Sequence, residues 1–121
     1  MQLQESGEMY LETIYILSRQ QDIVRSVDVA EHLGYSKPSV SRAVGVLKNA
    51  GYLGMEDGGA LVLTPAGMEI ASKIYDRHRV LTQLLLRLGV DGETAARDAC
   101  KMEHAISDRS LEAIRRHLQE T

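Results

Sequence analysis

Two short amphipathic segments, joined by a turn of about three residues, constrain the fold of this 121-residue chain more than any other feature. The first is "VDVAEHL", which Ser26 can cap and Gly34 can end. The second is "KPSVSRAVGVLKNA", with Ser36 as its cap, Pro38 in its first turn and Gly51 at its stop. The pieces "YLGM", "EDGG" and "ALVL" follow and indicate a small hairpin. Helix, turn, helix and hairpin in this order predict a winged helix-turn-helix.

The rest of the chain carries the three- and four-residue hydrophobic period of helices. Helices are expected over residues 8–18, from Pro65 to about Leu88 with Thr64 as cap, over roughly 93–106, and over 108–118 with Ser107 as cap. Because the chain contains no Phe or Trp, its core must be built from smaller apolar residues, which favours packed helices over a sheet sandwich. The expected fold class is mainly α with a small β-hairpin. It comprises a winged helix-turn-helix DNA-binding domain over residues 1–63 and a helical domain over residues 64–121.

Composition narrows the class of function. The formal net charge of -3 argues against a protein that coats nucleic acid by bulk electrostatics, but it allows a local basic surface. The N-terminus lacks the basic region and apolar stretch of a signal peptide, and no apolar run is long enough to span a membrane. The chain has one cysteine, which cannot form an internal disulfide and agrees with a reducing compartment. We therefore expect a cytoplasmic protein with no membrane partner.

The second short helix is the expected DNA-binding element, because in this motif it enters the major groove. Its side chains offer hydroxyls and positive charge for phosphates and one ring that can lie against a thymine methyl. The candidate DNA-binding residues are Ser36, Lys37, Pro38, Ser39, Ser41, Arg42 and Lys48. Val40, Val44 and Leu47 form the expected buried face, and the acidic Glu56 and Asp57 predict a wing with few phosphate contacts. The alternative is an ordinary amphipathic helix pair with a solvated basic edge.

Candidate metal ligands occur in three separate segments. On the helix expected over roughly 93–106, Cys100, Glu103 and His104 share one face, since positions i, i+3 and i+4 lie together. Met9 and Glu12 share a face of the first helix by the same rule. The long helix adds His78. Thiolate, carboxylate and imidazole together form a ligand set for first-row transition metals, although each residue taken singly is more often core filler or a solvated side chain.

The chain resembles the diphtheria toxin repressor and manganese transport regulator family of metal-activated transcription factors over almost all of its length. The match is carried by "EMYLETIYIL", "VDVAEHLGYSKPSVSRAVGVLKNAGYL", "LTPAG", "RHRVLTQLL" and "ACKMEHAISD", in this order and spacing. The resemblance implies that the helical domain both dimerises and binds metal, and that the dimer represses transcription from a palindromic operator of metal-homeostasis genes. Longer iron-type members continue into a small barrel domain, so the resemblance is to the short form, without that domain.

The family has iron-type and manganese-type sites, and this sequence resembles both in part. The iron-type primary site corresponds to Met9, Cys100, Glu103 and His104, whereas the manganese type has carboxylates at the first two of these positions. Glu12 resembles a manganese-type ligand, and His78 serves in the second site of both types. The other iron-type positions of that second site are Thr82 and Ala96 here. A second metal is therefore expected to use Glu12, His78 and Glu103.

The resemblance and the ligands together favour Fe(II), with Mn(II) second, because sulfur donors suit Fe(II) better than the harder Mn(II). Co(II), Ni(II) and Zn(II) are also expected to bind in vitro. The expected partners are double-stranded operator DNA and a second copy of the chain, with no small-molecule substrate. An enzyme with Cys100 as nucleophile would need an oxyanion site and a cleft that the sequence does not supply, so no enzyme is expected. A metal-independent winged helix regulator with a structural metal site remains the alternative function.

Overall fold

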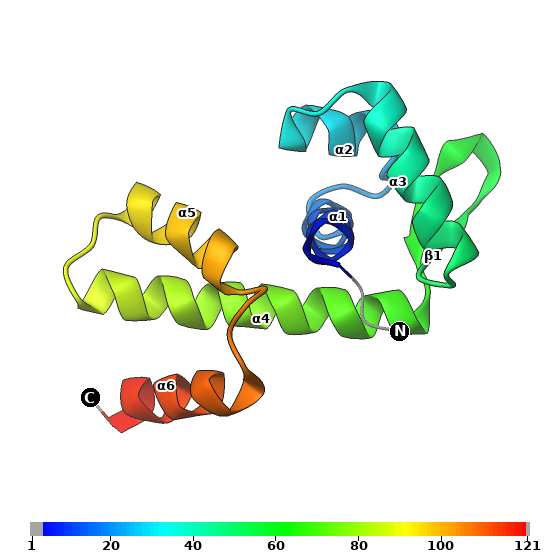
Figure 1. The fold of residues 1–121 in the computed structure, drawn as a ribbon. Coiled ribbons are helices and arrows are strands. Elements are labelled where there is room, and N and C mark those ends of the chain that lie inside the picture. The colour runs from blue at the N-terminus through cyan, green and yellow to red at the C-terminus, as the bar shows by residue number, and fades with distance from the viewer. Residues whose placement is uncertain (1–3, 121) are drawn as a thin grey trace. The chain divides into compact units, whose positions relative to one another are not determined.

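Six α-helices and one two-stranded hairpin make up residues 4–120, the part of the chain that this computed structural model describes (Figure 1). These residues form two compact units, with the division between Ser72 and Lys73. The predicted fold class, mainly α with a small β-hairpin and a winged helix-turn-helix, is confirmed. None of the helices within residues 4–120 is long and apolar enough to cross a membrane.

The first unit builds its core around the first helix. Its elements are α1 (Glu5–Ser18), α2 (Ser26–Leu33), α3 (Lys37–Asn49), β1 (Leu53–Met55), β2 (Leu61–Leu63) and the first turns of α4 (Pro65–Arg87). Leu11 and Ile14 of α1 are buried against α2, α3 and β2, together with Val29 and Val40. The predicted buried face of α3 is confirmed, since Val40, Val44 and Leu47 are all buried.

Helix caps in the first unit follow the sequence in two of three cases. The Ser36 hydroxyl accepts a hydrogen bond from the Ser39 amide at 3.3 Å, and Thr64 caps α4 through the Gly67 amide at 3.1 Å. The prediction that Ser26 caps α2 is wrong, because Ser26 is already the first helical residue. The N-cap position is Arg25, whose amide donates to the Asp28 carboxylate at 2.8 Å. An acidic side chain three residues into the helix supplies the capping interaction instead.

The wing is a short antiparallel hairpin held at its base and its tip. Leu53 pairs with Leu63 at one end and Met55 with Leu61 at the other, and the Leu61 amide donates to the Val24 carbonyl. The tip is a turn of 3-10 helix, η1 (Asp57–Gly59), in which Gly58 has the left-handed φ of 79°. The Arg25 Nε donates to the Gly58 carbonyl at 2.9 Å, which ties this tip to the segment between α1 and α2.

The second unit contains the rest of α4 together with α5 (Gly92–Met102) and α6 (Asp108–Glu120). Its core is formed by Val80, Leu81, Ala99, Leu111 and Leu118. Arginine side chains of α4 bind the C-terminal segment as well, since Arg87 donates to the Leu118 carbonyl at 2.8 Å. The three helices are therefore held by both apolar packing and hydrogen bonds from α4.

The helix predicted over roughly 93–106 ends earlier, at Met102. Beyond it, the amides of Ala105 and Ile106 both donate to the Met102 carbonyl, and Ser107 caps α6 through the Ser110 amide. Glu103 keeps helical dihedral angles as the C-cap, but His104 lies in the turn that follows. The predicted end of this helix near residue 106 is therefore wrong, whereas the convergence of Cys100, Glu103 and His104 as ligands stays a prediction.

Candidate metal centre and DNA-binding surface

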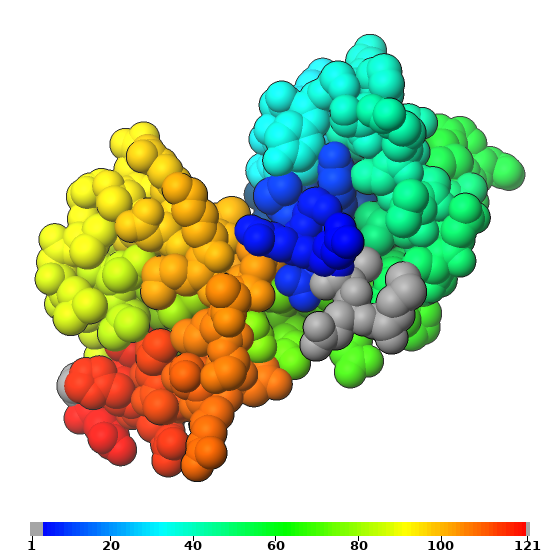
Figure 2. Space-filling model, in the orientation of Figure 1, coloured from blue at the N-terminus to red at the C-terminus, as the bar shows by residue number. Residues whose placement is uncertain are grey.

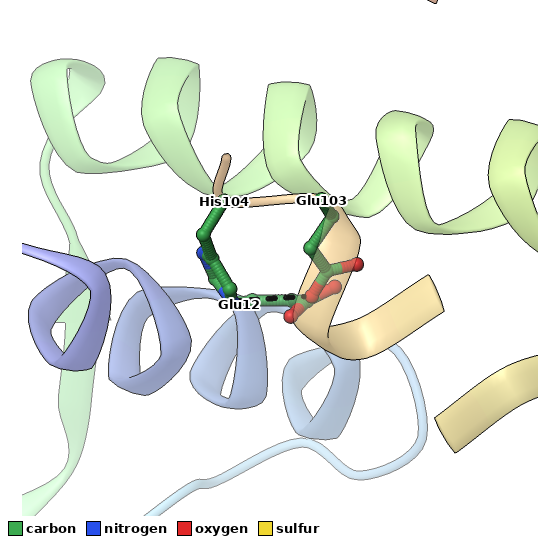
Figure 3. A group of neighbouring side chains, drawn as sticks. All are labelled: Glu12, Glu103 and His104. Atoms are coloured by element: carbon green, nitrogen blue, oxygen red, sulfur yellow. Dashed lines mark ion pairs between the residues drawn. The ribbon is translucent and has the colours of Figure 1, made fainter. Parts of the chain in front are cut away.

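A fully buried carboxylate, that of Glu103, is the centre of the candidate site in the second unit. Glu103 has 0% exposed surface. Its Oε2 lies 3.0 Å from Nδ1 of His78, and its Oε1 lies 3.4 Å from Nε2 of His104. Figure 3 marks the second of these ion pairs with a dashed line. Neither oxygen accepts a hydrogen bond from any donor among residues 4–120.

This arrangement is costly unless a positive charge balances it. A buried carboxylate without hydrogen-bond donors loses its hydration and gains little in return, and removing such a group's partner typically costs about 3–5 kcal/mol. The charge is balanced either by protonated imidazoles or by a cation that the carboxylate and the imidazoles bind together. Oxygen and nitrogen donors converging at a buried point suit a divalent first-row metal. The donors present in the second unit therefore fit a divalent metal ion.

The predicted sulfur ligand of the second unit, Cys100, lies near the end of α5. The thiol of Cys100 is partly buried, and Cys100 lies one helical turn before Glu103. The predicted positions Thr82 and Ala96 offer no ionisable ligand, and the Thr82 hydroxyl is buried without a hydrogen-bond partner in the described residues. The residues that the structure brings together within this unit are His78, Glu103 and His104.

The remaining predicted ligands belong to the first unit. Glu12 of α1, labelled in Figure 3, has 5% exposed surface and offers carboxylate oxygens as donors. Met9 is one helical turn earlier on α1 and is partly buried. A buried glutamate is unusual for a purely structural residue, and the role of Glu12 as a ligand stays a prediction.

One residue of the site was missed by the sequence prediction. Arg77, next to His78 on α4, is 8% exposed and donates to the carbonyls of Glu103 at 3.0 Å and Ile106 at 2.6 Å. It also binds the Asp108 carboxylate at 2.5 Å, and this hydrogen bond, followed by that of Lys73, lowers the pKa of Asp108. The sequence "DRHR" gave only a weak signal for the role of Arg77, because an arginine beside a candidate ligand is common on any exposed helix.

The predicted DNA-binding residues form an exposed surface on α3 and the turn before it. Lys37, Arg42 and Lys48 are all exposed, and none of the three forms an ion pair with another residue of the described chain. Pro38 and Ser41 are exposed as well, whereas Ser39 is partly buried. This segment, coloured cyan to green in Figure 2, lies at the surface of the first unit. Three unpaired cations on one short helix suit a phosphate backbone.

Two of the predicted hydroxyls are already used within the protein. Ser36 caps α3 and also donates from its hydroxyl to the Ser39 hydroxyl at 2.8 Å. The wing carries the predicted acidic pair, Glu56 and Asp57, and both are exposed. Positive charge for DNA is thus concentrated on α3 rather than on the wing.

A winged helix-turn-helix followed by a helical unit with a buried carboxylate and two imidazoles defines the class of metal-responsive DNA-binding regulators. The family model described as "Iron dependent repressor, N-terminal DNA binding domain" matches residues 2–61. The model described as "Iron dependent repressor, metal binding and dimerisation domain" matches residues 64–121. The chain belongs to this family, the diphtheria toxin repressor and manganese transport regulator family of metal-dependent transcriptional repressors, as its sequence predicted. The two domains indicate DNA and a second copy of the chain as partners.

Similar proteins come from archaea and bacteria. An HTH-type transcriptional regulator of Methanocaldococcus jannaschii is 34% identical over 115 residues, which cover 93% of this chain and 92% of that protein. The transcriptional regulator MntR of Escherichia coli O6:H1 is 38% identical over 106 residues, or 88% of this chain and 68% of that one. MntR of Geobacillus kaustophilus is 38% identical over 90% of this chain and 77% of its own.

Solved structures of the same fold include metal-bound forms. A manganese-dependent transcriptional repressor in complex with manganese has a TM-score of 0.85 at 31% identity, covering 93% of this chain and 52% of that one. The manganese regulator SloR has a TM-score of 0.83 at 28% identity, covering 95% of this chain and 54% of its own. The chain thus spans about half the length of these two solved proteins.

Proposed function

We propose that this protein is a metal(II)-activated repressor that binds a palindromic operator as a dimer, with Fe(II) favoured over Mn(II). The observation that carries the proposal is the Glu103 carboxylate, which is fully buried, faces two imidazoles and accepts no hydrogen bond from the described residues. A buried carboxylate of this kind lowers the stability of the metal-free protein. A bound cation would balance its charge and remove that cost.

Six residues are proposed to hold metal. Cys100, Glu103 and His104 of the second unit would form the primary site with Met9 of α1, and Glu12, His78 and Glu103 would hold any second ion. Bound there, a divalent cation supplies the positive charge that the buried carboxylate lacks and accepts lone pairs from donors of both units. The ligands on α1 and those around α5 would then hold the DNA-binding unit in one position relative to the dimerising unit.

On DNA, α3 would supply the contacts. Lys37, Arg42 and Lys48 would bind phosphates, Ser36, Ser39 and Ser41 would add hydroxyl contacts, and Pro38 would lie against a thymine methyl. Two copies of α3 about 34 Å apart can enter successive major grooves on one face of the duplex. A coupling free energy of about 1–3 kcal/mol between the ligand site and this spacing gives a roughly 5- to 150-fold change in operator affinity.

Metal preference is proposed from the donor atoms. Met9 and Cys100 supply sulfur, which favours Fe(II) over Mn(II), although the solved relatives named above are manganese regulators. The double variant Met9→Asp, Cys100→Glu replaces both sulfurs with carboxylates. In anaerobic titrations it is expected to shift DNA binding from activation by Fe(II) toward activation by Mn(II). An unchanged ratio of the two activation constants would contradict the ligand assignment.

A structural metal is distinguished from a regulatory one by the metal-free protein. We expect the protein in chelator to keep its helical circular dichroism and its cooperative unfolding while its operator affinity falls. If removal of metal unfolds the chain, or if operator affinity is the same in chelator and in metal, the site is structural or irrelevant to DNA binding. Either outcome would favour a metal-independent winged helix regulator.

A further inference from the structure

Arg77 joins α4 to the segment that carries the ligands Glu103 and His104. The guanidinium of this 8% exposed residue donates to the carbonyls of Glu103 and Ile106 from Nη1 and to the Asp108 carboxylate from Nη2. All three acceptors lie within residues 103–108, which comprise the connection between α5 and α6 and the first residue of α6. One side chain thus binds two main-chain carbonyls and one carboxylate in that turn.

These hydrogen bonds help to explain why α5 ends where it does. In a continuing helix the Glu103 carbonyl would accept from the amide four residues later. Here it accepts from Arg77 instead, while Ala105 and Ile106 both donate to the Met102 carbonyl. The chain is therefore free to leave the helix at Glu103 without leaving a buried carbonyl unpaired.

Glu103 is held to α4 at two points by consecutive residues. Arg77 binds its main-chain carbonyl at 3.0 Å, and the imidazole of His78 lies 3.0 Å from its carboxylate. A residue fixed at its backbone and facing a partner with its side chain has little freedom to turn away. Arg77 thus restrains the main chain of Glu103, and His78 restrains its carboxylate.

We propose that Arg77 is a positioning residue for the metal site, an inference that rests on the function proposed above. A guanidinium has no lone pair to donate to a metal, so Arg77 acts only through Glu103 and the turn that carries His104. Its planar fork binds acceptors in several directions at once, which a lysine ammonium on a flexible stem does not reproduce. Loss of the groups that orient metal ligands typically costs about 10- to 100-fold in metal affinity.

Lys73 provides a matched control. Its ammonium lies 3.2 Å from the same Asp108 carboxylate that Arg77 binds, and it projects from the same helix one turn earlier. The structure gives it no hydrogen bond to the carbonyls of residues 103–106 in the described chain. Lys73→Met therefore removes a cation near Asp108 and leaves the turn itself in place.

The test is Mn(II) binding to the full chain, measured by competition with a fluorescent chelator, for wild type, Arg77→Lys, Arg77→Met and Lys73→Met. Hydrogen exchange of the amides of residues 103–106 and thermal unfolding are measured on the same samples. We expect Mn(II) affinity to fall at least tenfold in Arg77→Lys, with faster exchange confined to this turn. Lys73→Met should stay within twofold of wild type. The visible spectrum of bound Co(II) should change in Arg77→Lys and stay as in the wild type in Lys73→Met.

Arg77→Lys keeps the positive charge, so its Mn(II) affinity decides the test if Arg77→Met does not fold. Mn(II) affinity within twofold of wild type in a folded Arg77→Lys overturns the inference, and so does an equal loss in Lys73→Met. A wild type that binds no Mn(II), Fe(II) or Co(II) overturns the proposed function itself, and with it any role of Arg77 in a metal site. Wild-type binding with unaffected Arg77 variants leaves the proposed function standing and removes only this inference.

Discussion

Replacing the buried Glu103 with its neutral isostere, glutamine, should stabilise the metal-free protein and abolish its response to metal. The carboxylate has 0% exposure and accepts no hydrogen bond from the described residues, so in chelator it is a burden on the fold. A glutamine amide can donate to the nearby Nδ1 of a neutral His78, which a carboxylate cannot do. The substitution therefore turns an unsatisfied contact into a hydrogen bond without changing the side-chain volume.

The magnitude follows from the cost of such a group. An unsatisfied buried polar group costs about 1–3 kcal/mol, and a charged one more. We therefore expect Glu103→Gln to raise the free energy of unfolding in chelator by about 1–3 kcal/mol. With an m-value of about 1–3 kcal/mol/M, the urea midpoint should rise by roughly 1 M. Metal at about 100 times its Kd should add about 2.7 kcal/mol to the wild type and nothing to the variant.

The assay is urea unfolding followed by circular dichroism, at about pH 8, above the range in which histidines ordinarily charge. Each protein is unfolded in chelator and in excess Mn(II). Glu112→Gln is the control, because its carboxylate is 59% exposed and pairs only with Arg115 in the described chain. That variant should match the wild type in both buffers, since exposed ion pairs contribute little.

Two results would refute this reasoning. If Glu103→Gln unfolds at lower urea than the wild type in chelator, the carboxylate stabilises the metal-free fold through its imidazole partners. If Mn(II) stabilises the variant as much as the wild type, Glu103 is not a ligand.

Three further predictions concern packing, pH and DNA. Gly67→Ala should lower the free energy of unfolding by about 1–3 kcal/mol, because its Cβ would lie 2.1 Å from the Tyr52 carbonyl oxygen; an unchanged urea midpoint would contradict this. The Arg77 hydrogen bond lowers the pKa of Asp108 below 3.8, so the advantage of wild type over Asp108→Asn in urea should be present above that pH and vanish as pH falls through the lowered pKa; an advantage that grows in acid would be inconsistent with this sign. Arg42→Ala should weaken binding to all duplexes and reduce the slope of log affinity against log salt by about 1; an unchanged slope would remove Arg42 from the phosphate contacts.

Features set by nearby residues could be predicted from the sequence. The N-cap at Ser36, the buried face of α3 and the hairpin all depend on residues within a few positions of one another. The one cap that was predicted wrongly, at Ser26, failed because Asp28 offers its carboxylate to the Arg25 amide and so starts the helix one residue earlier. The correct cap at Ser36 and the incorrect one at Ser26 both depend on side chains within three residues of the helix start.

The arrangement of the candidate site could not be read from spacing in the same way. The end of α5 at Met102 is accompanied by hydrogen bonds from Arg77, which is 26 residues from Glu103 in the sequence. The helical period predicts a common face for Glu103 and His104 only if the helix continues past Glu103. The Glu103 carbonyl, which would accept the next helical hydrogen bond, instead accepts one from Arg77 of α4. The pairing of Glu103 with His78 likewise depends on tertiary packing rather than on periodicity.

Operator binding under anaerobic conditions tests the central claim most directly. A fluorescent duplex, selected from a random pool by the protein in Mn(II), is titrated with wild type and Glu103→Gln in chelator, in Fe(II) and in Mn(II). We expect wild-type affinity to rise roughly 5- to 150-fold with metal, at lower free Fe(II) than Mn(II), and the variant to stay at its metal-free affinity. Equal affinity of the wild type in chelator and in both metals would contradict the claim that this protein is a metal-gated repressor.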